Sequence, residues 1–225
     1  MSDLHLSEAS GKPMDVFGPR WENHTEKMKQ HWDETLEAED VMIISGDVSW
    51  GLKMEEALPD FQWIHERPGL KLITRGNHDL WWSSLTRLNS LYEDLRFIQN
   101  GCVVAGDTAV CGTRGWILKQ AAPEWTEHDE KIYRREQIRM KMALDAAAAS
   151  GASRIILSLH YPPTDHNGRD TEFTRLIEQY DVTCVLYGHL HGEDAYFHAY
   201  NGRKNGILYR LVSSDYLAFK PERIL

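Results

Sequence analysis

The sequence predicts an α/β fold built around a largely parallel central sheet. Short apolar runs rich in β-branched residues recur along the chain, and each has the length of a buried strand. Stretches with helical character lie between these runs, an alternation typical of parallel strands joined by helices. The chain has 225 residues, of which 42% are hydrophobic and 26% charged, so it can bury a sizeable core and is not disordered, collagenous or a coiled coil.

No repeat, low-complexity tract or Pro/Gly/Ser-rich linker divides the sequence, and we expect one domain over residues 1–225. The segments predicted to form buried strands are residues 41–44, 70–74, 155–159 and 182–186. The stretches predicted to form helices are residues 20–38, 52–66, 128–150 and 171–180.

The third predicted helix is indicated by apolar residues at helical spacing, namely Ile138, Met142, Ala146 and Ala149. Gly151 provides its stop signal. Two further regions, 96–112 and 195–214, have the pattern of β-hairpins, the second with its turn at residues 200–206. Because hairpins pair antiparallel, we expect the sheet to be mixed or doubled.

The composition limits the class of partner. The formal net charge is −9, so strong binding to nucleic acid or to anionic lipid is not expected, although nucleic acid could still be a substrate. The three cysteines have no Cys-x-x-Cys spacing and are expected to be reduced core residues: Cys102, Cys111 and Cys184. The sequence shows no leader pattern and no apolar run of about 18 residues, so we expect a cytoplasmic protein without a membrane partner.

Polar clusters follow each of the predicted strands at its carboxyl end. Ligands of open α/β sheets bind outside the carboxyl ends of the strands, so these clusters are expected to converge on one crevice. A further cluster near the N-terminus has a carboxylate and an imidazole at alternate positions, which point the same way in an extended segment. The clusters are Asp3-Leu4-His5, Ser45-Gly46-Asp47, Arg75-Gly76-Asn77-His78-Asp79, His160 and Gly188-His189-Leu190-His191.

The clusters contain a donor set suited to metal ions. Two carboxylates, one amide and four imidazoles are available without a thiolate, which favours Mn, Fe, Zn, Co or Ni over a structural cysteine–zinc site. Seven ligands are too many for one tetrahedral ion and fit two divalent ions that share a bridging carboxylate, about 3.5–4 Å apart. The candidate ligands are Asp3, His5, Asp47, Asn77, His160, His189 and His191.

The order of these blocks over residues 3–191, Asp-x-His, Gly-Asp, Gly-Asn-His-Asp, His and Gly-His-x-His, resembles that of the calcineurin-like metallophosphoesterase family. The resemblance implies a four-layer α-β-β-α sandwich of two mixed sheets flanked by helices. It also implies two metal sites that share Asp47 as a bridge. The first would consist of Asp3, His5, Asp47 and His191, and the second of Asp47, Asn77, His160 and His189.

The same resemblance implies a phosphoesterase activity. A hydroxide that bridges the metals would attack the phosphorus of a phosphomonoester or phosphodiester in line, with His78 as general acid or phosphate ligand, oriented by Asp79. A small phosphate ester is the expected substrate, because the chain is small. The alternative is a catalytically weak metal-binding scaffold that serves as a protein-interaction module, but the presence of His78 and of every ligand favours the enzyme.

Other residues near the clusters are weaker candidates. Arg114 lies between glycines after an apolar run, where it is equally consistent with binding a substrate phosphate and with a solvated loop. Tyr161 follows His160 and is a weaker candidate for substrate contact. Four tryptophans after the site segments are expected mainly to pack: Trp50, Trp81, Trp82 and Trp116. Six histidines that follow no strand are expected to have no catalytic role: His24, His31, His65, His128, His166 and His198.

The sequence departs from the family pattern at one place. The family has an apolar strand before Asp-x-His, and here only Met1 and Ser2 precede Asp3. Either the sequence is truncated or another segment takes the place of that strand, and we expect a truncation. A missing first strand predicts that Asp3 and His5 lie on a fraying terminus.

Overall fold

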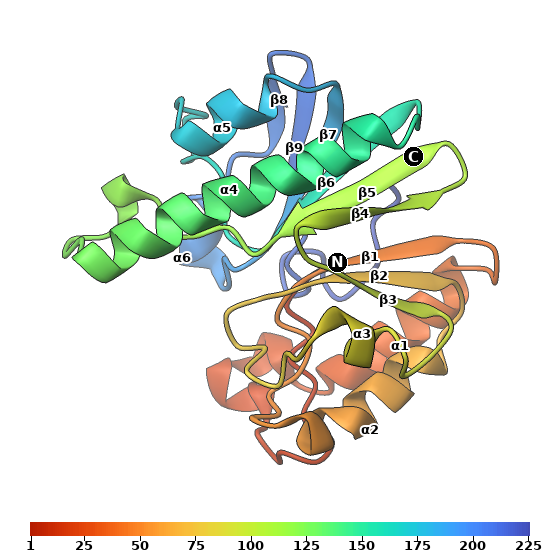
Figure 1. The fold of residues 1–225 in the computed structure, drawn as a ribbon. Coiled ribbons are helices and arrows are strands. Elements are labelled where there is room, and N and C mark those ends of the chain that lie inside the picture. Colours follow the sequence, from red (N-terminus) through yellow and green to blue (C-terminus); the bar gives the residue numbers. More distant parts are fainter.

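The computed structural model describes residues 1–225 and confirms the α/β prediction (Figure 1). Two sheets lie face to face. The first contains three parallel strands in the order β1 (Val41–Ser45), β2 (Leu70–Thr74) and β3 (Leu95–Ile98). The second is mixed and has the order β4 (Gly101–Ala105), β5 (Thr108–Thr113), β6 (Arg154–Leu159), β7 (Val182–Tyr187), β9 (Ile207–Leu211) and β8 (Gly202–Lys204).

Helices cover the two outer faces (Figure 1). On the first sheet lie α1 (His24–Thr35), α2 (Met54–His65) and the short α3 (Leu85–Leu88). The second sheet is covered by α4 (Glu127–Ala149) and α5 (Glu172–Ile177), and the short α6 (Glu193–Tyr196) follows β7. Three 3-10 turns complete the structure, at Met14–Phe17, Pro19–Trp21 and Lys119–Ala121. No helix is both long and apolar enough to cross a lipid bilayer.

Apolar clusters fill the spaces between these layers. Trp32, Phe61 and Ile73 belong to the cluster between the first sheet and its helices. A smaller cluster joins residues of both sheets, including Leu72 and Ile156. The four predicted strands are therefore buried on both faces, which explains why they are continuous apolar runs rather than alternating ones.

Helix α4 lies where the sequence predicts a helix, but two of the apolar residues that indicated it face solvent. Thr126 caps its first turn through a reciprocal pair of hydrogen bonds with Asp129. The buried side carries Leu144, whereas Ile138 is 63% exposed and Met142 51% exposed. The apolar spacing of those two residues thus identified a helix but not its core-facing side, because other apolar residues contact the sheet.

The hairpin predictions need correction. Residues 95–98 form β3 of the first sheet, so the hairpin predicted at 96–112 consists of β4 and β5 alone. The second hairpin, β8–β9, turns at Asn205 and Gly206, both with positive φ, and not over the whole of residues 200–206. Its first strand begins at Gly202, within the segment expected to be the turn.

No strand precedes Asp3, yet the N-terminal residues are well fixed. The Met1 ammonium donates to Ile43 O at 2.9 Å, and Ser45 N donates to Met1 O at 2.9 Å. On its other side, Ser2 forms a parallel β-bridge with Ser213, in the segment after β9, and Ser2 N donates to Val212 O at 2.7 Å. Asp3 is 0% exposed, so the expectation of a fraying terminus was wrong. A cavity of about 350 Å³ lies beside Met1, between β1 and the inner face of the second sheet.

Candidate metal centre

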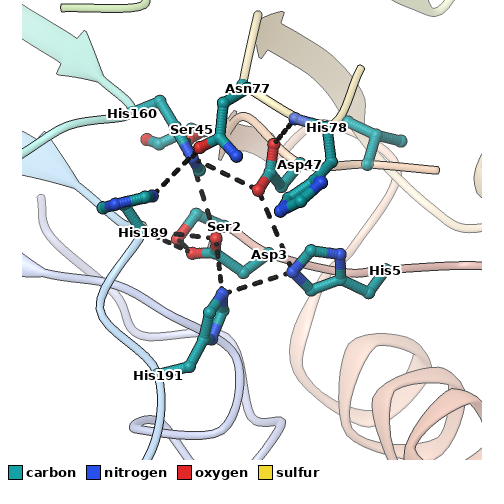
Figure 2. Close-up of polar contacts among 12 residues, drawn as sticks. Ser2, Asp3, His5, Ser45, Asp47, Asn77, His78, His160, His189 and His191 are labelled. Carbon is teal, nitrogen blue, oxygen red and sulfur yellow. Dashed lines mark hydrogen bonds and ion pairs between the residues drawn. The ribbon is translucent and has the colours of Figure 1, made fainter. Parts of the chain in front are cut away.

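The clusters predicted to converge do so at one edge of the two sheets (Figure 2). Asp47 follows β1, and Asn77 and His78 follow β2. From the second sheet come His160, directly after β6, and the segment 188–191 after β7. The carboxyl ends of parallel strands share an edge, so residues from both halves of the chain meet there.

The Asp3–His5 segment reaches the site by a route that strand alternation did not predict. It runs beside the loop after β1, with Asp3 N donating to Gly46 O at 2.8 Å and His5 N donating to Asp47 O at 3.1 Å. Asp3 has φ 59° and His5 has φ 47°, so the segment is not a regular extended strand. The backbone bends direct both side chains inward.

Positive φ recurs among the candidate ligands. Asp3, His5, Asp47 and His189 all adopt it. For residues other than glycine this region is sparsely populated and costs of order 1–3 kcal/mol each, although Asp and His tolerate it better than most residue types. The concentration of such residues indicates a functional site rather than a chance cluster of polar groups.

One group of donors surrounds Asp3. His191 Nε2 lies 3.0 Å from Asp3 Oδ1. His5 Nε2 lies 3.2 Å from His191 Nε2 and 3.9 Å from Asp47 Oδ2. These are the four residues expected to hold the first metal.

A second group of donors surrounds Asn77. His160 Nε2 lies 2.7 Å from Asn77 Oδ1 and 3.3 Å from Asp47 Oδ2. His189 Nδ1 lies 3.0 Å from the same Asn77 oxygen. Asp47 therefore contacts both groups, which is the position expected of a bridging carboxylate (Figure 2).

The donor set fits divalent cations. Two imidazole nitrogens face each other 3.2 Å apart at His5 and His191, an arrangement in which both cannot be protonated. Donor atoms about 3–3.5 Å apart are the spacing that bonds of about 2.1 Å to a common ion produce. The carboxylates of Asp3 and Asp47 are buried, and buried carboxylates require a compensating positive charge.

Burial and the nearby carboxylates shift the pKa values of these histidines in opposite directions. Burial alone would lower the pKa of His160 and His191, but Asp47 and Asp3 raise that of His160 to about 9, and Asp3 and Asp215 raise that of His191 to about 10. Burial lowers the pKa of His5 and His189 to about 3. Metal ions bind neutral imidazole, so divalent cations held here would take the place of protons on His160 and His191 and would balance the charge of the carboxylates.

The hydrogen bonds of Asp79 go to backbone groups and not to the His78 ring, so its role in orienting His78, which the resemblance implies, stays a prediction. The buried Asp79 carboxylate accepts hydrogen bonds from Gly76 N at 2.7 Å, Val48 N at 2.8 Å and Asp47 N at 3.0 Å. Burial and the Asp47 charge raise the pKa of Asp79 to about 7. Asp79 thus joins the loops after β1 and β2, which positions Asp47 and Asn77.

His78 lies at the exposed rim of the site. Its backbone N–H donates to Asp47 Oδ1 at 2.8 Å, and its ring centroid lies 4.5 Å from that of Trp50. Trp50 also stacks on His5, with centroids 4.7 Å apart. Trp50 therefore packs, as expected, but against the site itself, where it keeps the His78 ring at the entrance.

A comparison with known protein families finds a match over most of this chain. Residues 1–193 match the calcineurin-like phosphoesterase family, a span that contains every candidate ligand and His78. The chain belongs to this family.

Known relatives of this calcineurin-like phosphoesterase include proteins of bacterial viruses. The Gene 66 protein of Mycobacterium phage D29 is 26% identical over 191 residues, which are 84% of this chain and 76% of the phage protein. The Gene 66 protein of Mycobacterium phage L5 is 31% identical over 78 residues, 35% of this chain and 37% of the phage protein. Among solved structures, AQ665 of Aquifex aeolicus, a protein of unknown function, superposes with a TM-score of 0.51 at 12% identity, covering 98% of this chain and 91% of that one, a likeness of fold.

One buried residue of this phosphoesterase was missed in the sequence. Asp215 Oδ1 lies 3.3 Å from His191 Nδ1, and Asp215 Oδ2 accepts from Gly192 N at 2.9 Å. The contact leaves His191 Nε2 directed at Asp3, as a carboxylate behind a metal-binding histidine does. A signal was present, because Asp215 follows the apolar strand β9 just as the other polar clusters follow theirs.

The two candidate substrate contacts lie side by side near the centre. Tyr161 is buried, and its ring centroid is 4.2 Å from that of His189. Arg114 O accepts hydrogen bonds from His160 N and Tyr161 N, both at 3.0 Å. These hydrogen bonds fix the loop after β5 against the loop after β6. Arg114, which belongs to the loop after β5, is thereby held beside the site.

Proposed function

We propose that this calcineurin-like phosphoesterase hydrolyses a phosphomonoester or phosphodiester with two bound divalent metal ions. The observation that carries the proposal is the position of Asp47, whose carboxylate contacts both donor groups from the boundary between them. A binding site for a single ion would not need a buried carboxylate shared in this way.

The donor groups divide into two sets of four. Asp3, His5, Asp47 and His191 would hold one ion, and Asp47, Asn77, His160 and His189 the other. Bound there, the ions supply an activated water molecule and stabilise negative charge on the phosphoryl oxygens. Mn, Fe, Zn, Co and Ni all suit these oxygen and nitrogen donors.

The protein's own residues position and protonate the substrate. His78 would donate a proton to the leaving oxygen, since its ring lies at the exposed rim, next to the donor groups. Asp79 keeps the loops after β1 and β2 together, so that His78 and Asp47 retain their separation during turnover. The proposed substrate is a small phosphate ester, and the proposed location is the cytoplasm. The three free cysteines support that location, because thiols stay reduced there.

Turnover of p-nitrophenyl phosphate and of its bis-ester, with Mn²⁺ and the other candidate metals, tests the proposal. We expect hydrolysis of at least one ester by metal-loaded protein and its loss after chelation. His78→Asn is expected to lower kcat by about 10²-fold or more while metal content stays unchanged. Equal, negligible activity in metal-loaded and chelated wild-type protein would refute the proposed function.

A further inference from the structure

Two arginines lie next to the candidate metal centre, one from each sheet. Arg75 follows β2 and Arg114 follows β5. The ends of these strands touch, because a Cβ added to Gly112 would meet Thr74 Cγ2 at 2.6 Å. In the first sheet β2 is the neighbour of β1, which Asp47 follows. In the second sheet β5 is the neighbour of β6, which His160 follows. The two arginines therefore flank the site on the same side.

Neither guanidinium group has a hydrogen-bond acceptor or an ion-pair partner in the protein. Both side chains are half-buried, yet neither makes a hydrogen bond or an ion pair, and Arg75 Nε is fully shielded from solvent without an acceptor. By contrast, Arg67 pairs with Asp33 at 2.6 Å through one Nη atom, although its Nε also has no acceptor, and Arg210 pairs with Glu222. Leaving a buried donor unpaired destabilises a fold, so the retention of Arg75 Nε, next to the equally unpaired guanidinium of Arg114, points to an acceptor that comes from outside the chain.

The nearby carboxylates are already engaged. Glu136 pairs with Arg139 at 2.7 Å and accepts from Thr113 Oγ1 at 2.7 Å. Asp79 is surrounded by backbone N–H groups. Burial lowers the pKa of both Arg75 and Arg114; the charge of Glu136 opposes this shift at both groups, and the Arg135 guanidinium adds to it. Arg75 and Arg114 are therefore two positive charges beside the site without an ion-pair partner of their own.

The Arg114 side chain is also oriented. Its Cζ atom lies 4.6 Å from the centroid of the Trp116 ring. Trp116 in turn packs against Tyr161, with centroids 5.4 Å apart, and Tyr161 packs against His189. A guanidinium held by its face on an indole keeps its edge donors free, and a phosphate group accepts such donors in pairs.

We propose that Arg75 and Arg114 form a subsite for a second phosphate group, so that the substrate is a phosphoanhydride such as a nucleoside diphosphate. The inference rests on the proposed function of the metal centre, where the terminal phosphate would bind, and extends that function from phosphate esters to a phosphate anhydride. Water adds to the terminal phosphorus, and the bond from that phosphorus to the bridging oxygen breaks. The bridging oxygen leaves on the nucleoside monophosphate, one proton of the water stays on inorganic phosphate and the other passes to solvent.

The arginine pair favours this reaction for an electrostatic reason. The leaving monophosphate gains negative charge as the anhydride bond breaks, and two fixed guanidinium groups stabilise that charge better than solvent does. An aryl phosphate has no second phosphate and gains nothing from the subsite. A preference of the enzyme for substrates with two adjacent phosphates would therefore identify the subsite.

Kinetics with ADP and with p-nitrophenyl phosphate test the subsite in wild-type protein and in Arg75→Met and Arg114→Met. Each substitution is expected to lower kcat/KM for ADP by about tenfold or more and that for p-nitrophenyl phosphate by less than about threefold. Arg134→Met is the matched control, because Arg134 is 73% exposed on α4 and carries the same charge. It should leave both values unchanged.

Two kinetic outcomes would overturn the inference. Equal losses on both substrates would show that the arginines hold the scissile phosphate itself, and unchanged ADP turnover would show that they bind no substrate group. Circular dichroism confirms that each variant is folded.

A binding measurement separates this inference from the proposed function. Calorimetric titration of metal-loaded protein with inorganic pyrophosphate and with inorganic phosphate should show tighter binding of pyrophosphate, and Arg114→Met should remove the difference. Loss of that preference supports the subsite even in a protein that hydrolyses neither substrate, a result that would refute the proposed function alone. Equal affinities of wild-type protein for the two anions would overturn the subsite.

Discussion

At the scale of single residues, Asp47 has the most consequential position. Its carboxylate contacts His5 and His160, which belong to different donor groups, and it accepts the His78 backbone N–H. The hydrogen bond to His78 links the proposed bridging carboxylate to the proposed general acid. Any change at Asp47 should therefore affect metal binding and catalysis together.

Asp47→Asn is expected to remove at least one of two bound ions per chain and to lower kcat/KM by about 10²-fold or more, because an amide is a weaker, uncharged ligand. Metal analysis after dialysis measures the first effect, and ester hydrolysis the second. Asp181→Asn, at an exposed position, is the control and should retain both ions. A fully metallated, active Asp47→Asn protein would contradict the bridging role.

Asp215 should act through His191 and not on the substrate. Asp215→Ala is expected to lower metal affinity by about 10- to 100-fold, because the His191 ring loses the acceptor that fixes its orientation. Asp215→Asn keeps an oxygen acceptor and should recover part of the affinity. Metal titration provides the measurement, and unchanged affinity in a folded Asp215→Ala protein would reduce Asp215 to a packing role.

At the scale of elements, the loops after the strands depend on close backbone approach. A Cβ on Gly76 would overlap the Asp47 carboxylate and its backbone nitrogen. The turns after β1 and β2 therefore pack together only because residue 76 has no side chain.

Gly76→Ala is expected to lower stability by about 2 kcal/mol and to abolish most of the activity, since the two loops must separate. Urea unfolding and ester hydrolysis measure these effects. Gly101→Ala, where an added Cβ meets nothing within 4 Å, is the matched control and should change neither. Wild-type activity in Gly76→Ala would show that the loops can move apart without loss.

Helix α4 offers a second test at this scale. Leu144 is 0% exposed and Met142 51% exposed, although they are two residues apart on one helix. Leu144→Ala should therefore lower the free energy of unfolding by about 3 kcal/mol, and Met142→Ala by less than about 0.5 kcal/mol. Chemical denaturation measures both values. Equal losses would mean that the outer side of α4 is covered in solution.

At the scale of the whole molecule, the candidate metal centre joins the two sheets. Its donors come from the loops after β1 and β2 on one side and after β6 and β7 on the other. Bound cations would thus crosslink the two halves of the sandwich and stabilise the folded state over the unfolded one.

Chelation is accordingly expected to lower Tm. An ion present at about 100 times its Kd contributes about 2.7 kcal/mol to the stability of the native state, which is lost on removal. Thermal scans with Mn²⁺ and with chelator measure the shift, and Asp47→Asn should show a smaller one. A Tm that is independent of metal in wild-type protein would argue against ions at the interface of the sheets.

The sequence by itself determined the fold class, four of the strands, the four longest helices and the set of candidate ligands. These properties are local: the run of apolar residues in β6 or β7 and the polar cluster after each strand are visible without knowledge of any distant partner. The seven expected ligands come together in the structure, five of them because they follow parallel strands whose carboxyl ends share an edge.

The tertiary structure alone decided which residues became neighbours across the chain. It assigned residues 95–98 to the first sheet, turned Ile138 outward, and bent Asp3 and His5 into the site through positive φ. It also placed Asp215 behind His191 and left Arg75 without a partner. Burial and pairing depend on surfaces contributed by segments far apart in sequence, and no local pattern specifies them.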